Sequence, residues 1–144
     1  MSVVNDIEVN ADNKETFQVI CRINNIGDLG KFTTISGFRL QGNSYQTLVQ
    51  MQNVDNTLQH TYRKPVLGTS VSGWRAVGEY DTGNANARDS YVGVARQVSD
   101  MSCNDVVAYR CEVAYTTPSP NFDSHTGIIA KVLNVSGNVY LVIV

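Results

Sequence analysis

The sequence predicts an all-β protein whose strands pack as a two-layer sandwich. Most apolar segments alternate with a period of two residues, and clusters of turn-forming residues separate them at regular intervals. Helical signals are weak, because the 11 glycines are spread along the chain and prolines stand at positions 65, 118 and 120. We expect about eight or nine short strands, a number typical of a sandwich or barrel.

Side-chain alternation places the individual strands. Phe17, Val19, Cys21 and Ile23 share one face of the first long strand. The segment at 45–51 alternates with glutamines and predicts a half-solvated strand with a glutamine face. Further strands are expected at 7–9, 34–40, 70–80, 90–98, 106–115, 128–133 and 139–144. Turns are expected at 24–28, 41–43, 81–84 and 136–138.

The composition indicates one ordinary globular domain that spans residues 1–144. Hydrophobic residues make up 42% and charged residues 17%, which argues against a disordered tail. The net charge is −2 and no Lys/Arg cluster is present, so nucleic acid is a poor candidate partner. No apolar run reaches the ~18 residues that a membrane-spanning helix needs.

The segment from Asp105 to Cys111 indicates the kind of sandwich. Tyr109 lies two residues before Cys111 on an apolar stretch that Asp105 opens. This pattern is typical of strand F of an immunoglobulin domain, where the Tyr bonds back to the backbone at a corner. Three disulfide pairings are open. We expect Cys21–Cys111, because both residues lie on strands of matching alternation. Cys103 is then free or paired outside the domain, and the alternative is three reduced, buried thiols.

The long interval between the two cysteines predicts an immunoglobulin-like β-sandwich of the variable type, with extra strands between C and E. Strand C should carry a buried aromatic residue against the disulfide. Trp74 comes too late in the chain for this position, so Phe38 is the predicted substitute. Trp74 is expected near strand D as a core residue.

Asp105 and Tyr109 are expected to form a structural corner between strands E and F. In variable-type domains the corner Asp commonly pairs with an Arg from strand D. Arg75 and Arg88 are the candidates for that Arg. We assign this corner to stability and not to function.

Five segments carry a family resemblance, and they are 21–25, 34–40, 57–58, 102–105 and 109–112. Together they resemble the immunoglobulin domains of molluscan fibrinogen-related proteins, which have a Cys on strand B, an Asn-rich loop and a strand C without Trp. The resemblance covers Phe17 to about Val113. It implies a secreted invertebrate immune lectin in which this domain accompanies a fibrinogen-like lectin domain. Invertebrate surface receptors with variable-type domains fit nearly as well.

Loops at one end of a variable-type sandwich carry recognition. The predicted loops are B–C at 24–32, F–G at 116–125 and a middle loop near 53–56. The candidate ligand-binding residues are Asp28, Lys31, Tyr115, Phe122, Asp123 and His125. Tyr115 and Phe122 are the predicted anchors, because rigid aromatic rings give contact area at a small entropy cost. The alternative is that these loops are ordinary solvated connections.

We therefore expect a non-catalytic, extracellular recognition module of a secreted or surface immune or adhesion protein. Its partner would be a protein or glycan ligand. The face with Gln46, Gln50 and Gln52 could also pair with a second copy as a weak homodimer. The alternative is a structural β-sandwich of a capsid, fibre or surface protein, and a carbohydrate-binding sandwich is a third reading.

Motifs for catalysis or metal binding are missing from the sequence. His60 and His125 are the histidines, and no paired-His, CxxC, GxSxG or phosphate-loop spacing occurs. We expect no enzymatic activity, no metal and no cofactor. Asn134 begins an N-glycosylation sequon, which would lie on the surface of a secreted domain. No signal-peptide pattern is evident. The cysteine pattern favours a trimmed ectodomain fragment, and the alternative is a cytosolic protein with its native start.

Overall fold

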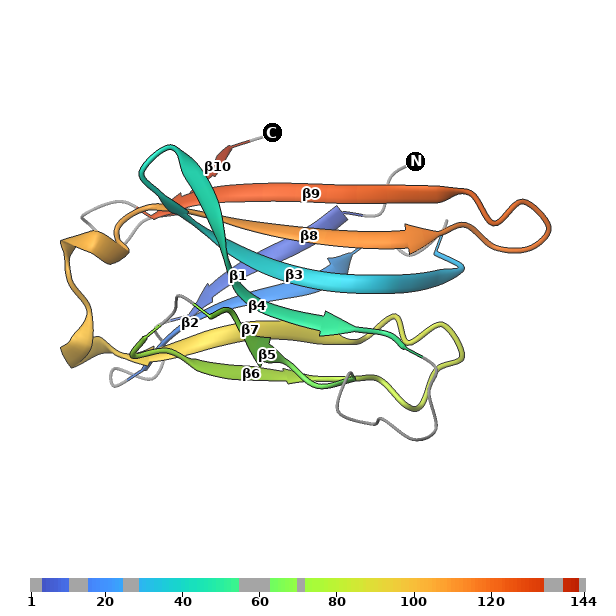
Figure 1. Cartoon of the computed structure of the whole chain (residues 1–144), viewed down its shortest axis with the longest axis horizontal. Helices are drawn as coiled ribbons and strands as arrows, with labels where there is room; N and C mark the ends of the chain where they lie inside the picture. Colours follow the sequence, from blue (N-terminus) through green and yellow to red (C-terminus); the bar gives the residue numbers. More distant parts are fainter. Residues whose placement is uncertain are drawn as a thin grey trace.

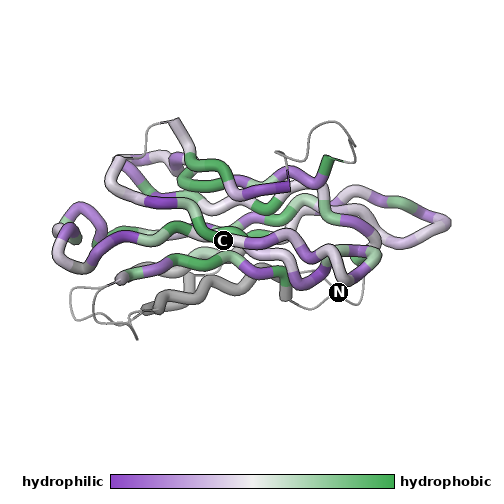
Figure 2. Tube along the Cα trace, turned by 90° about the horizontal axis from the view of Figure 1, so that it is seen from below, coloured by the Kyte–Doolittle hydropathy of each residue, from purple (hydrophilic) through white to green (hydrophobic). Residues whose placement is uncertain are grey.

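The computed structural model describes residues 4–10, 16–24, 29–54, 63–69, 72–133 and 139–142. Its strands form two antiparallel sheets that face each other across an apolar core (Figure 1). Hydrophobic stretches lie mainly along the middle of the strands, and the two ends of the molecule are mostly hydrophilic or neutral (Figure 2). The polar ends agree with the turn-forming residues that the sequence places between the strands.

The strands in chain order are β1 (Val4–Asn10), β2 (Thr16–Asn24), β3 (Lys31–Gln41), β4 (Ser44–Gln52), β5 (Val66–Leu67), β6 (Arg75–Glu79), β7 (Tyr91–Gln97), β8 (Ala108–Thr116), β9 (Ser124–Leu133) and β10 (Val139–Val142). The 3-10 helices η2 (Val98–Asp100) and η3 (Cys103–Asp105) lie between β7 and β8. The strand predicted at 70–80 is shorter than expected, and β5 was not predicted. β9 starts before the predicted position 128, because its polar first residues are held by backbone pairing with β8.

The strand order identifies the sandwich type. One sheet has the order β1-β2-β7-β6 and the other the order β10-β9-β8-β3-β4-β5. These correspond to strands A-B-E-D and G-F-C-C′-C″, so the fold is an immunoglobulin-like β-sandwich of the variable type. The predicted extra strands between C and E are β4 and β5. β10 adds a further strand beyond strand G.

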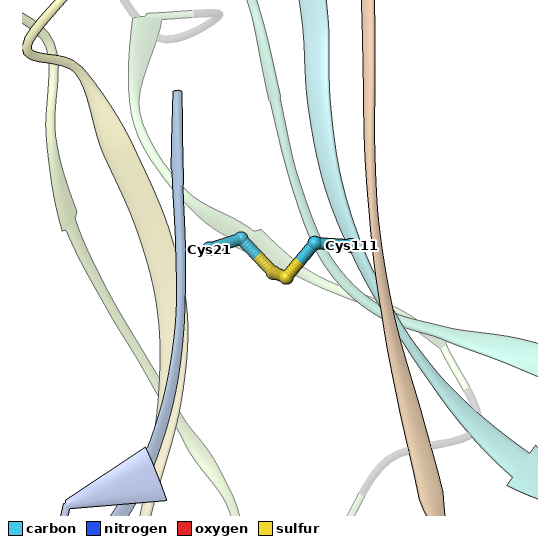
Figure 3. Close-up of a disulfide and its surroundings, with 2 residues drawn as sticks. All are labelled: Cys21 and Cys111. Atoms are coloured by element: carbon cyan, nitrogen blue, oxygen red, sulfur yellow. A yellow bond between two sulfur atoms is a disulfide. The ribbon is translucent and has the colours of Figure 1, made fainter. Parts of the chain in front are cut away.

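A disulfide joins the two sheets through the centre of the core. Cys21 on β2 and Cys111 on β8 are bonded, with their Cα atoms 5.5 Å apart (Figure 3). Their side chains are 1% and 0% exposed. The predicted pairing is confirmed, and Cys103 is a free, exposed thiol.

The prediction for strand C is wrong, because Phe38 does not face the disulfide. Its neighbour Gly37 does: a Cβ atom built there would lie 3.4 Å from the sulfur of Cys21. Phe38 points to the outer face of the sheet, where its ring lies 4.7 Å from the guanidinium carbon of Arg110. Trp74 is a core residue just before β6, as predicted, and its ring lies 6.2 Å from that of Phe17.

A β-bulge divides the predicted glutamine face. The register between β3 and β4 shifts at this point, and Leu48 is the extra residue. Gln46 therefore lines a groove at one end of the sandwich. Gln50 faces outward and its amide nitrogen donates to the Ser36 hydroxyl at 3.2 Å. The prediction of one continuous glutamine face is wrong, because sequence alternation alone does not reveal a bulge.

Asp105 and Tyr109 form the predicted corner before strand F. The Tyr109 hydroxyl donates to the carbonyl oxygen of Asp105 at 2.6 Å. The Asp105 Oδ2 accepts from the backbone N–H of Ser102 at 2.9 Å. Its Oδ1 lies 3.2 Å from Arg39 Nη1 and 3.5 Å from Arg96 Nη1. The carboxylate is 1% exposed, so charge pairing compensates for its burial.

The prediction that Asp105 pairs with Arg75 or Arg88 is wrong. Arg75 begins β6 and is exposed. Arg88 lies in the loop that enters β7, at the opposite end of the sandwich. Arg39 and Arg96 take this role instead, because β3 and β7 both run toward the corner and carry these residues near their ends.

Candidate functional site

Four connections gather at one end of the sandwich. The B–C, C′–C″, D–E and F–G segments lie there because β3 and β7 begin at this end while β4, β6 and β8 finish there. The β8–β9 loop extends furthest from the sheets in Figure 1, on the right. We refer to this surface, defined by residues 29–31, 53–54, 80–90 and 117–123, as the loop end.

The β8–β9 loop is closed at its base and exposed at its tip. The Thr117 N–H donates to the Asp123 carbonyl at 2.8 Å, and the Asp123 N–H donates to the Thr117 hydroxyl at 2.8 Å. Between them, the Phe122 side chain is 63% exposed. Its φ of 49° lies in the left-handed region, which is unfavourable for a bulky side chain. The loop therefore holds an exposed apolar ring in place at some conformational cost.

The B–C segment is attached directly to this loop. The Gly30 N–H donates to the Thr116 carbonyl at 2.8 Å. A Cβ atom at Gly30 would lie only 2.5 Å from the Thr117 carbonyl oxygen, so the close approach requires glycine. Exposed Lys31 pairs with Thr116 in the sheet and so lies beside the base of the loop.

Tyr115 differs from its predicted role as an exposed anchor. Its side chain is 4% exposed and belongs to the core. The ring of His125 stacks on it with centroids 5.7 Å apart. His125 itself is exposed, so Tyr115 supports a surface residue from below.

The C′–C″ segment leaves the sheet at an anchored residue. Buried Asn53 donates its side-chain amide to the Phe32 carbonyl at 3.0 Å and its backbone N–H to the Thr33 carbonyl at 2.8 Å. Asp28, in the predicted B–C loop, lies outside the described residues, as does the rest of the predicted middle loop at 55–56.

The D–E loop was missed as part of the site. Its sequence signal was the turn cluster at 81–84, which predicts a loop but not its position in space. Asn86 of this loop donates its amide to the Leu29 carbonyl at 3.4 Å, which joins it to the B–C segment. The Tyr80 ring lies 6.0 Å from that of Phe32 and 4.7 Å from the guanidinium carbon of Arg63.

The carboxylate of Asp81 holds a turn at the loop end. Asp81 Oδ1 accepts from the Gly83 N–H at 3.0 Å, and its Oδ2 accepts from the Asp89 N–H at 3.3 Å. Within the described residues, no group of three or more His, Cys, Asp or Glu side chains could hold a metal ion. His60 and the predicted glycosylation site Asn134 lie outside the described part of the chain.

No helix in the described ranges has both the length and the apolar character needed to cross a membrane. The 3-10 turns η2 and η3 are three residues long each.

Comparisons with known proteins add little beyond the architecture. No known family matches the chain, and no curated protein matches it. A structure of murine CRIg aligns with a TM-score of 0.46 and 11% identity over 86% of this chain and 92% of that chain. A chain from a structure concerning T cell specificity and activation by the bacterial superantigen toxic shock syndrome toxin-1 aligns with a TM-score of 0.45 and 10% identity, over 78% of this chain and 80% of that chain. Similarities this distant do not indicate what this chain binds.

Proposed function

We propose that this chain is a non-catalytic, extracellular recognition module that binds a protein or glycan ligand through its loop end. The observation that carries this proposal is Phe122, which is 63% exposed at the tip of a loop closed at its base. An exposed aromatic ring on a pre-organised loop is typical of binding hot spots. Lys31, Asp123 and His125 are exposed around the same loop and would supply polar contacts.

The core disulfide supports an extracellular location. Structural disulfides persist in oxidising compartments and are rare in the cytosol. A secreted or surface immune or adhesion protein fits this chemistry. The sequence resemblance to molluscan fibrinogen-related proteins points the same way, and membership of that family remains part of the proposal.

The test is to screen the tetramerised domain against a glycan array and a panel of secreted and surface ectodomains. Any ligand is then measured with Phe122→Ala and with the control Val66→Ala. Val66 is 57% exposed on the short edge strand β5, three strands across the sheet from β8 and its loop. We expect Phe122→Ala to weaken binding by about 30-fold, as a typical hot spot does, and Val66→Ala to leave it unchanged. Binding that ignores Phe122→Ala would contradict the loop-end site. If no ligand is found, the alternative of a structural sandwich is favoured.

A second proposed contact is a weak homodimer through the outer face of the six-stranded sheet. Arg110 lies 4.7 Å from the Phe38 ring and 4.4 Å from the Tyr45 ring, and all three side chains are half-buried. Such an arginine–aromatic cluster on an otherwise open sheet suits a self-complementary interface. Sedimentation velocity over a concentration series tests this, with Arg110→Ala expected to reduce association. A monomer at every concentration would rule it out.

A further inference from the structure

A groove of about 580 Å³ opens at the end of the sandwich opposite the loop end. In Figure 1 the β3–β4 hairpin and the η2–η3 segment lie at this end, on the left. The groove is lined by residues of the hairpin, of η3, of the end of β7 and of the segment before β6. Its volume falls within the range of roughly 300–1,000 Å³ that small-molecule sites occupy.

The charged residues that line the groove are Arg39, Arg96 and Asp105, which leaves one positive charge in excess. Asp105 is already satisfied, because its two oxygens are used by the two guanidinium groups and by a backbone N–H. The carboxylate therefore does not compete for a ligand cation. The arginines keep the capacity to attract an anion.

Several donors in the groove wall are unused. The Nε atoms of Arg39 and Arg96 and the Nε1 atom of Trp74 are buried and have no hydrogen-bond partner among the described residues. Trp74 is 6% exposed and lies under Arg96, whose guanidinium carbon is 5.4 Å from its ring. A buried N–H group without an acceptor is energetically unfavourable. After small side-chain shifts, a ligand that brings acceptors into the groove would give these N–H groups hydrogen-bond partners.

Beside the apolar Leu40, Leu48 and Val107, the lining also carries amide and hydroxyl side chains, among them Gln41, Gln46, Ser72 and Asn104. Such groups pair with hydroxyls, whereas planar guanidinium groups match planar carboxylates. We propose that this groove binds a small, polyhydroxylated carboxylate, the chemistry of an acidic monosaccharide. This site is separate from the loop end and does not depend on it.

The chain contains its own reporter for this groove. Trp74 is the one tryptophan in the sequence, so fluorescence excited selectively at tryptophan comes from a residue that lines the groove. The protein is titrated with D-glucuronate, with neutral D-glucose and with inorganic phosphate, at constant ionic strength. We expect a saturable fluorescence change with glucuronate, and weaker or no response to glucose and phosphate. Equal responses to glucuronate and glucose, or tighter binding of phosphate, would overturn the assignment.

Charge variants test the same site without breaking the Asp105 ion pairs. Gln46→Glu and the more exposed Gln41→Glu each add a negative charge to the groove. Each should weaken glucuronate binding by roughly tenfold, about 1.4 kcal/mol of repulsion. The matched control is Gln52→Glu, because exposed Gln52 lies at the far end of β4. If the control weakens binding equally, or neither groove variant changes it, the proposal fails.

The free thiol gives a second readout. Cys103 lines the groove and is exposed, so bound glucuronate should slow its reaction with a thiol reagent. Glucose at the same concentration should not slow it. Unchanged thiol reactivity at saturating glucuronate would place any binding outside the groove.

Discussion

The hydroxyl of Tyr109 donates a hydrogen bond of 2.6 Å to the carbonyl oxygen of Asp105, four residues earlier. The carboxylate of the same Asp105 pairs with Arg39 and Arg96. One residue therefore fixes the corner through its main chain and joins both sheets through its side chain. The corner sets where β8 begins, and so holds Cys111 in the register that reaches the disulfide.

Replacing Tyr109 with Phe tests the corner hydrogen bond. The variant leaves the Asp105 carbonyl without its donor in a buried setting, so we expect a loss of about 1–2 kcal/mol in the free energy of unfolding. Urea denaturation measures this loss. Tyr45→Phe is the matched control, because half-buried Tyr45 lies on the outer sheet face, and its effect should stay within about 0.5 kcal/mol. Equal losses in the two variants would show that the corner bond contributes nothing specific.

The titration of Tyr109 predicts an alkaline limit to stability. Burial, and to a smaller extent the Asp105 carboxylate, raise the pKa of the Tyr109 phenol well above its ordinary value, although Arg39 and Arg96 act in the opposite direction. Because the phenol has a raised pKa in the folded state, the unfolded chain loses its proton first as the pH rises. The stability that neutral Tyr109 contributes is therefore fully present below the unfolded pKa of about 10, and it is lost as the pH rises beyond that value. Unfolding free energies measured from neutral to strongly alkaline pH should fall more steeply for the parent protein than for Tyr109→Phe. Parallel curves would contradict this assignment.

The Asp105 ion pairs predict which arginines contribute to the stability of the fold. Asp105→Asn leaves two guanidinium groups without a counter-charge, and we expect a loss of about 3 kcal/mol. This is the low end of the range for breaking a buried pair, because both arginine side chains are 20% exposed and partly solvated. Arg75→Gln and Arg88→Gln should each change stability by less than about 0.5 kcal/mol. Chemical denaturation of the three variants measures these changes in the free energy of unfolding. A large effect of Arg75→Gln would contradict the observed pairing.

The sequence predicted those parts of the fold that depend on local pattern. Tyr109 and Cys111 stand at a fixed spacing on one strand, and Cys21 lies on another strand of clear alternation, so the corner and the disulfide could both be inferred. The arginine partners could not. Arg39 and Arg96 meet Asp105 only because two strands from different sheets end beside it, a relation that spacing does not encode.

The β3–β4 bulge accounts for the error in the predicted glutamine face. One extra residue, Leu48, changes which neighbouring side chains face the core, so Gln46 and Gln50 fall on different sides. For the candidate site, the loop with Phe122 could be predicted from its polar composition and prolines. The burial of Tyr115 and the contribution of the D–E loop depend on packing that only the folded chain provides.

Removing the disulfide should lower stability strongly. The bridge closes a sequence separation of 90 residues, and the Cys21→Ala/Cys111→Ala variant should lose about 2–5 kcal/mol in unfolding free energy. Part of this loss comes from chain entropy in the unfolded state and part from the space that the two sulfurs leave in the core. Cys103→Ser is the control and should be nearly neutral, because that thiol is exposed and free. Equilibrium unfolding in urea distinguishes the two, and a neutral double variant would mean that the core alone holds the sheets together.

The strained backbone of Phe122 can be measured as a stability difference, separately from its proposed role in ligand binding. Its left-handed backbone conformation is unfavourable for a phenylalanine by about 1–2 kcal/mol, whereas Asn adopts this conformation more readily. Because the side chain is 63% exposed, Phe122→Asn loses little buried surface. We therefore expect the variant to be more stable by up to about 1 kcal/mol in thermal or urea unfolding, and to lose affinity for any loop-end ligand. A destabilised variant would mean that the ring packs usefully on its own domain, and that Phe122 is held in place for folding instead of binding.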